Sequence, residues 1–375
     1  MEQRALSSSV SPEASGAQST SNRFSPRKII VFLFLFAVLV GALIVRFVVL
    51  PSLAARADMN ATPQCDEHVI PVHLSPLDLV TYNVIGWLCY RGSLSQYQLV
   101  QVLVSGATYN HSYWDFPYQP DTYSYVEAME NAGYAVFNYD RLGYGLSDHP
   151  AATLITIEAD AYVLHQIVQD LRSGAVEGYA FSQVLLVGHS FGSAISIEEA
   201  ATYADVDGLL LSGFLHYEDP AVLPELTTDL ELADLDPNFQ DLPPGYLTSV
   251  PNSRGSLFYY QPNADPQVIA TDEATKDVVT DSEVASFFTV SNSTISQFIQ
   301  VPVLEAVGQY DNIFCLGLLS CTNGASVWDY ESLYYSPQAD LRVIVVPDAG
   351  HALNLQLNAS TAWFPQAIHW IQTTF

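Results

Sequence analysis

The chain has 375 residues, of which 49% are hydrophobic, so it can bury a large core in one big domain or two smaller ones. Near-average glycine and proline contents, and the lack of an internal repeat, exclude a fibrous or disordered protein. Its 40 acidic residues against 12 basic ones repel nucleic acid, which is therefore not an expected partner.

The N-terminal region carries half of the basic residues, and from Asp58 onward 38 acidic residues accompany only 6 basic ones. Residues 1–28 are polar and end in two basic residues, which 17 uncharged apolar residues follow. We predict a cytoplasmic tail over 1–28, a transmembrane signal anchor over 29–50 and an extracytoplasmic domain over 58–375. The alternative is a cleaved signal peptide that ends near residue 57, which would make the protein secreted and not a single-pass type II membrane protein.

The cysteines and glycosylation acceptors agree with an oxidising, extracytoplasmic compartment. A predicted hairpin of residues 67–74 and 80–90, centred near residue 77, places Cys65 opposite Cys89 and leaves Cys315 to pair with Cys321. The sequence contains no C-x-x-C pair of the kind that binds zinc, and we expect neither a metal nor a cofactor. Asn-X-Ser/Thr acceptors occur at Asn60, Asn110, Asn292 and Asn358.

The rest of the domain alternates strand and helix patterns. Alternation of this kind predicts an α/β fold with a mostly parallel, doubly wound sheet, to which the N-terminal hairpin adds antiparallel strands. In chain order we expect a strand over 98–106, a helix over 122–133, a strand over 134–140, a helix over 156–174, a strand over 183–187, a helix after Ser190, a strand over 206–214, a strand over 301–308, a helix over 325–335, a strand over 341–347 and a helix over 361–375.

Residues 217–300 interrupt this alternation between two strands. A long insertion inside a compact sheet domain is more typical of a lid than of a loop. Residues 224–235 have Leu226 and Leu230 on one helical face, so we expect a helical lid that includes them.

The stretch "LLVGHSFGSA" contains a candidate nucleophile, Ser190. A Gly-X-Ser-X-Gly turn, here with His189 as the first X, needs a strand before it and a helix after it to hold the serine above the sheet, and both are predicted. Gly188 and Gly192 must lack side chains so that strand and helix can approach each other.

A serine hydroxyl needs a base, and the base needs an orienting group. His351 lies in the loop after the last predicted strand, and Asp311 follows the strand over 301–308, so we assign these as base and acid. His369, in the terminal helix, is expected to be structural. Asp348, Glu218 and Asp219 are the alternative acids.

Three stretches, "SGATYNHSYWDFPYQPDTYSYV", "NYDRLGYGLSDHP" and "VGHSFGSA", resemble the α/β-hydrolase superfamily, including secreted or anchored microbial and fungal members. The resemblance runs from about residue 65 to the end. It implies backbone oxyanion donors at Phe191 and Ala107, although Ser105-Gly106 stands where such proteins usually have His-Gly. It also implies that Asp140, Arg141 and Gly143 brace a loop.

These features predict a serine hydrolase of esterase or lipase type that acts through an acyl-enzyme. An aromatic, acidic entrance favours a small, neutral or apolar ester. Alternatively, the same aromatic residues pack the lid against the body. An amide or peptide hydrolase with the same triad, or an inactive membrane-tethered binding module on this fold, remains open. The aromatic residues concerned are Tyr109, His111, Tyr113, Trp114, Phe258, Tyr259 and Tyr260.

Overall fold

The computed structural model describes residues 61–216, 229–315 and 319–375. The chain divides into two units, 1–55 and 56–375, and all described residues belong to the second. The predicted tail and signal anchor lie outside the described residues, as do Asn60, Glu218, Asp219 and Leu226. None of the helices in the described ranges is both long and apolar enough to cross a membrane.

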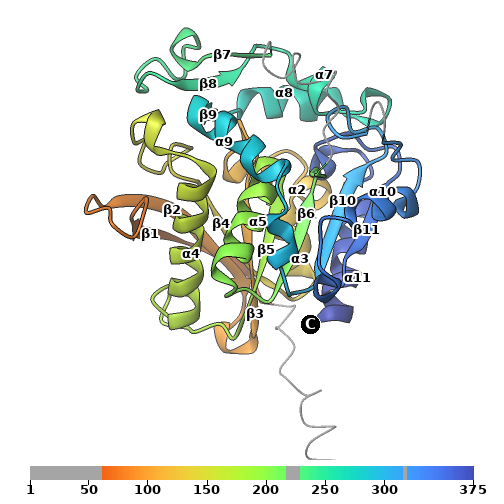
Figure 1. The fold of residues 1–375 in the computed structure, drawn as a ribbon, viewed down its shortest axis with the longest axis horizontal. Coiled ribbons are helices and arrows are strands. Elements are labelled where there is room, and N and C mark those ends of the chain that lie inside the picture. Colours follow the sequence, from red (N-terminus) through yellow and green to blue (C-terminus); the bar gives the residue numbers. More distant parts are fainter. Residues whose placement is uncertain (1–60, 217–228, 316–318) are drawn as a thin grey trace, which may run out of the picture. The chain divides into compact units, whose positions relative to one another are not determined.

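An eight-stranded sheet forms the centre of the domain (Figure 1). Its strand order is β1-β2-β4-β3-β5-β6-β10-β11; β1 and β2 are antiparallel to each other, β2 is antiparallel to β4, and the remaining neighbours are parallel. The predicted α/β fold is therefore confirmed. The strands are β1 (Pro63–Val72), β2 (Tyr82–Arg91), β3 (Leu99–Val104), β4 (Ala135–Tyr139), β5 (Gln183–His189), β6 (Gly208–Ser212), β10 (Val303–Gly308) and β11 (Arg342–Val346).

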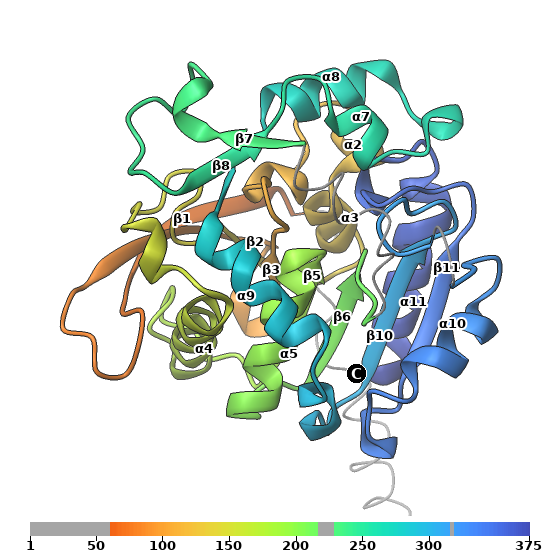
Figure 2. The same cartoon turned by 45° about the horizontal axis from the view of Figure 1, so that its top comes forward.

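Helices cover both faces of this sheet, which is why its central strands read as continuous apolar runs. All six residues of β3 are buried. The helices α4 and α5 pack together on one face, and α3 and α11 pack together on the other (Figure 2). The helices are α2 (Pro120–Tyr123), α3 (Tyr125–Asn131), α4 (Ile157–Ser173), α5 (Phe191–Tyr203), α7 (Arg254–Leu257), α8 (Pro266–Ala274), α9 (Asp281–Ser291), α10 (Gly324–Glu331) and α11 (Phe364–Thr374).

The N-terminal hairpin has the predicted register. Cys65 lies opposite Cys89 across β1 and β2, and the two form a disulfide. The second predicted disulfide, between Cys315 and Cys321, closes a short loop that follows β10.

The lid, meaning here residues 229–300, is partly a sheet and not only helical. It contains the antiparallel strands β7 (Leu230–Leu232), β8 (Tyr246–Ser249) and β9 (Val278–Thr280), together with α7, α8 and α9. The helix predicted over 224–235 is therefore wrong at Leu230–Leu232, and in its described part only a 3-10 turn at Ala233–Leu235 is helical. The three residues Leu-Glu-Leu are compatible with the period of a helix and with that of a strand, and pairing with β8 makes them a strand.

Inside the lid, Lys276 joins two segments. Its ammonium lies 3.0 Å from an Asp236 carboxylate oxygen and donates to the Ser249 carbonyl at 2.8 Å. The side chain is 5% exposed, so this amine is almost fully withdrawn from solvent.

Candidate active site

Ser190 occupies a strained turn between β5 and α5. Its φ of 53° and ψ of −118° fall where a residue other than glycine is rarely found. The backbone holds this conformation through Ser190 N, which donates to the Ser212 carbonyl at 2.7 Å. A side chain at Gly188 would lie 2.5 Å from Ser193 Cα, and one at Gly192 would lie 2.1 Å from the Val104 carbonyl oxygen. The two glycines are thus required by close backbone approach and not by positive φ.

His351 and Asp311 meet at the carboxyl end of the sheet. His351 Nδ1 lies 2.9 Å from Asp311 Oδ2, and both residues are buried. The other Asp311 oxygen accepts from the backbone N–H groups of Ile313 and Phe314 at 2.8 and 3.1 Å. These bonds fix the carboxylate plane, so that Asp311 can orient the imidazole. The alternative acid Asp348 is exposed in a turn.

The loops that carry Ser190 and His351 also converge. The rings of His189 and His351 are 5.0 Å apart, and a side chain at Gly213 would touch both the His189 ring and the His351 carbonyl. Burial, and next the neighbouring His351, lowers the pKa of His189 well below its usual value. His189, stacked on Tyr113 at 4.2 Å, therefore stays neutral and acts as packing beside the candidate base.

The loop after β3 lies directly against the serine. A side chain at Gly106 would lie 3.2 Å from Ser190 Cβ. The predicted donors in this region are the N–H groups of Ala107 and Phe191, and neither finds a hydrogen-bond acceptor among the described residues. Phe191 is the first residue of α5, where the helix dipole favours negative charge. Thr108 has a φ of 59°, so the loop itself is strained.

The lid holds one side of this loop through what we call the Arg254 cluster: Arg254, Asp272, Tyr109 and Tyr259. Arg254 Nη1 donates to the Thr108 hydroxyl at 2.9 Å and to its carbonyl at 3.3 Å, and Nη2 donates to Asp272 at 2.9 Å. Both tyrosine hydroxyls donate to the same carboxylate, and the guanidinium lies 4.1 Å from the Tyr109 ring centroid. Two backbone bonds complete the attachment: Thr108 N donates to the Val278 carbonyl of β9, and Asp277 N donates to the Thr108 carbonyl.

The body holds the other side through the Arg141 cluster: Arg141, Asp160, Glu283 and Tyr144. Arg141 Nη2 donates to the Gly106 carbonyl at 3.3 Å, while Nη1 is shared between Asp160, at 3.1 Å, and Glu283 of lid helix α9. The two neighbours of Ala107 in the chain, Gly106 and Thr108, thus each accept from a buried arginine. Each of these arginines is also bonded to a carboxylate of the lid. Sequence reasoning assigned Arg141 to loop bracing but missed its lid partner, which is 142 residues away.

The neighbouring residues of the "DRLGYG" turn brace the region differently. Asp140 accepts from the His111 backbone and ring and from Leu146 N, at 2.8 to 2.9 Å. Gly143 has a φ of 85°, which suits glycine. His111 also packs on Trp87, so it supports the turn and does not line the site.

Most of the other aromatic residues singled out in the sequence pack the lid against the body. Tyr109, Tyr113, Trp114, Phe258 and Tyr259 are buried, and Tyr109 contacts Phe258 at 5.5 Å between ring centroids. Tyr260 stacks on Tyr310 at 4.0 Å. The packing alternative therefore describes these residues better than an open aromatic entrance.

A phenylalanine cluster instead borders His351, and of its members the sequence analysis singled out Phe258 as an aromatic side chain and Phe191 for its backbone N–H. Phe258 and Phe314 lie 5.6 and 6.0 Å from the imidazole. The cluster continues through Phe214, Phe287 and Phe191, each within 6.1 Å of the next. The residues come from both lid and body, which gives the surroundings of the candidate base an apolar character.

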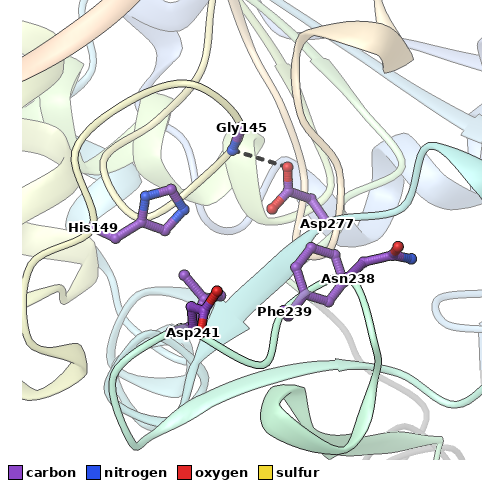
Figure 3. Close-up of a pocket in the computed structure, with 7 residues that line it drawn as sticks. Gly145, His149, Asn238, Phe239, Asp241 and Asp277 are labelled. Carbon is purple, nitrogen blue, oxygen red and sulfur yellow. Dashed lines mark hydrogen bonds between the residues drawn. The ribbon is translucent and has the colours of Figure 1, made fainter.

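A hollow of about 220 Å³ lies elsewhere on the lid–body boundary (Figure 3). It contains none of the candidate catalytic residues. Asp277 accepts there from Gly145 N at 2.9 Å. Its lining residues are Gly145, His149, Asn238, Phe239, Asp241, Leu242 and Asp277.

The glycosylation acceptors differ in exposure. Asn110 Nδ2 donates to Asp277 at 2.8 Å, and Asn358 Nδ2 donates to the Pro347 carbonyl at 2.8 Å. Asn292, which follows α9, is exposed. A glycan is therefore accommodated most easily at Asn292.

Comparison with known proteins agrees with this geometry. Residues 101–362 match the model of the alpha/beta hydrolase family, while no curated protein matches the chain. The fold is similar to a putative aryl esterase from Burkholderia cenocepacia, at 18% identity over 82% of this chain and 99% of that one with a TM-score of 0.55. It is similar to a soluble variant of monoglyceride lipase from Saccharomyces cerevisiae, at 16% identity over 84% and 97% with a TM-score of 0.57.

A third similar structure, the enol-lactonase from Burkholderia xenovorans LB400, has 15% identity over 78% of this chain and 97% of that one, with a TM-score of 0.52. At these identities the solved structures show the fold alone. The family model, in contrast, covers well over half of the sequence. The chain therefore belongs to the alpha/beta hydrolase family.

Proposed function

We propose that the protein is an extracytoplasmic serine hydrolase that cleaves a carboxylic ester with a neutral or apolar acyl group, through Ser190, His351 and Asp311. One observation carries the proposal: the hydrogen bond of 2.9 Å between His351 Nδ1 and Asp311 lies at the same edge of the sheet as the strained Ser190 turn. This arrangement supports nucleophilic catalysis by a serine.

In the proposed reaction, Ser190 Oγ attacks the ester carbonyl while His351 Nε2 takes the hydroxyl proton. Asp311 holds the opposite N–H of the imidazole and stabilises the imidazolium. The alcohol leaves with the proton from His351, and water then releases the acid from Ser190 by the same steps. The N–H groups of Ala107 and Phe191 stabilise the oxyanion, and one such donor contributes about 10²–10³-fold to kcat in comparable enzymes.

The substrate class follows from the surroundings of His351. The five rings of the phenylalanine cluster favour an apolar acyl group, and the formal charge of −28 disfavours an anionic substrate. The names of the similar structures, an aryl esterase, a monoglyceride lipase and an enol-lactonase, also point to oxygen esters. The two disulfides favour the oxidising compartment that an extracytoplasmic location provides.

A fluorophosphonate probe and a series of p-nitrophenyl esters test the proposal on the purified full-length chain. Ser190→Ala should lose the label, while Ser196→Ala, on the same helix, should keep it. Asp311→Asn should keep its unfolding midpoint but lose about 10²–10⁴-fold in kcat, because the imidazole loses its orienting charge. Labelling that survives Ser190→Ala would contradict the nucleophile, and faster cleavage of anilides than of esters would contradict the substrate class.

A further inference from the structure

A second cluster of titratable side chains lies at the far end of α5 from Ser190. It consists of His165 from α4, Glu199 from α5 and Asp205 from the loop before β6, and one ligand atom from each lies within 4.8 Å of the others. Glu199 is nine residues along α5 from the serine, about 13 Å at the rise of an α-helix. The cluster is therefore separate from the candidate active site.

The burial of the Glu199 carboxylate is the unexplained feature of this cluster. Its side chain is fully buried, and neither carboxylate oxygen has a hydrogen-bond partner among the described residues. Leaving a buried carboxylate without a partner is strongly unfavourable. Glu199 Oε1 is directed toward His165, 3.8 Å from Nδ1.

The nearest cation does not supply the missing partner. Arg172 donates through Nε to the Asp205 carbonyl, through Nη1 to the Ser182 carbonyl and through Nη2 to the Asp207 carboxylate. Each of the three guanidinium nitrogens thus has an acceptor other than Glu199.

The contact between His165 and Asp205 has the spacing of two ligands of one ion. His165 Nδ1 and Asp205 Oδ2 are 2.8 Å apart. Despite this short distance they do not form a hydrogen bond, and Nδ1 has no other hydrogen-bond partner among the described residues. Bonds of about 2.0–2.1 Å in a tetrahedral zinc site place neighbouring ligands about 3.3 Å apart. The observed separations of 2.8 and 3.8 Å bracket that value.

The surroundings also suit a cation. Tyr203 stacks on the His165 ring at 4.0 Å and fixes its plane, and Gln169 Nε2 donates to Asp205. The helix α5 ends at Tyr203, so its negative dipole end faces the cluster. Ala204, with a φ of 51°, turns the chain back and brings Asp205 beside the helix end.

We propose that His165, Glu199 and Asp205 bind a zinc-class divalent cation, with Nδ1 and one oxygen from each carboxylate as ligands. A neutral imidazole and two carboxylates balance a charge of +2, and a mixed nitrogen–oxygen set suits zinc better than calcium or magnesium. His165 and Asp205 are 23% and 17% exposed, which leaves a route for the ion and a position for water. The ion would join α4 to α5, the helix that directly follows the candidate nucleophile.

This proposal departs from our expectation that the chain binds no metal, and it does not depend on the proposed hydrolysis. The sequence carries no signal for it, since the three residues are spread over two helices and a loop with no metal-binding spacing. In the sequence, Glu199 looks like one of two ordinary acidic residues of a helix.

Metal content and thermal stability of the full-length protein test it without an activity assay. After incubation with ZnCl₂ and gel filtration, one zinc per chain should remain, and saturating zinc should raise Tm by about 5 °C, whereas CaCl₂ should not. Cobalt should give the visible bands of tetrahedral coordination. Glu199→Gln should lose all three signals, and the control Glu198→Gln, one residue away, should keep them.

His165→Gln gives a second variant in case Glu199→Gln fails to fold, because this histidine is partly exposed and its loss leaves the core unchanged. It should fold and retain no zinc. The proposal is overturned if wild type retains no zinc and shows no rise in Tm, or if His165→Gln or Glu199→Gln binds zinc as wild type does, which would place the ion elsewhere on the acidic surface.

Discussion

The Arg254 cluster and the Arg141 cluster both join the lid to the body, but they differ in charge balance. Arg254 has one carboxylate partner, Asp272, whereas Arg141 is shared between Asp160 and Glu283. Burial, and next the neighbouring Glu283, raises the pKa of Asp160 well above its usual range. The first cluster is therefore a matched pair, and the second has an excess of acid. Loss of a carboxylate should therefore lower the free energy of unfolding more in the Arg254 cluster than in the Arg141 cluster.

The largest expected effect is that of Asp272→Asn. It leaves the buried Arg254 guanidinium without a counter-charge, and such changes cost about 3–5 kcal/mol of unfolding free energy. Glu283→Gln should cost about 1 kcal/mol, because Asp160 still balances Arg141 and glutamine still serves the capping box of α9. Chemical denaturation of both variants measures the two losses. Equal losses would remove the distinction between the clusters.

The next effect concerns activity and separates positioning from stability. Arg254→Lys keeps the charge but replaces the two nitrogens that reach Thr108 and Asp272 separately by a single ammonium on a shorter side chain, so the strained loop that carries Ala107 should relax. We expect kcat to fall by about 10²-fold with KM little changed, since the oxyanion forms only after substrate is bound. Arg342→Lys, at an exposed ion pair, is the matched control. Unchanged kcat in Arg254→Lys would show that the loop keeps its shape without the lid.

Asp277 provides a third lid–body contact, in which no arginine takes part. Its carboxylate accepts from Asn110 and from the backbone of Gly145 and Val278, and burial raises its pKa to about 6. The folded state therefore holds a proton that the unfolded state has released between about pH 4 and pH 6. Stability must fall as pH rises through this window, by about 2–3 kcal/mol relative to Asp277→Asn. The same stability difference between wild type and Asp277→Asn at pH 4 and at pH 7 would contradict this.

The smallest effect is expected at Asn292, away from both clusters. Asn292→Gln should remove a glycan, detectable as a change in electrophoretic mobility, without altering the unfolding midpoint. Asn110→Gln should instead lower stability, because it breaks the bond to Asp277. A mobility change in Asn110→Gln with no loss of stability would reverse this assignment.

The sheet, the hairpin register and the order of Ser190, Asp311 and His351 could be predicted because each rests on local patterns. Strand period, glycine spacing and loop position are all encoded within about ten residues of the feature concerned. Cys65 opposite Cys89 needed only the centre of the hairpin.

The lid strands and the two arginine clusters could not be predicted, because they depend on long-range partners. β7 is three residues long and exists only by pairing with β8, and Arg141 meets Glu283 across 142 residues. One signal was nevertheless present. With only six basic residues for 38 acidic ones from Asp58 onward, each cation was a candidate for a specific role, and Arg141, Arg254 and Lys276 are indeed buried.

The buried Lys276 ammonium also decides how the native protein can be handled chemically. It is the single lysine among the described residues, and its amine is held by Asp236 and Ser249. The chain's other lysine, Lys28, lies outside the described residues. Lysine-directed dyes and cross-linkers would therefore leave the described part of the chain unmodified while it stays folded.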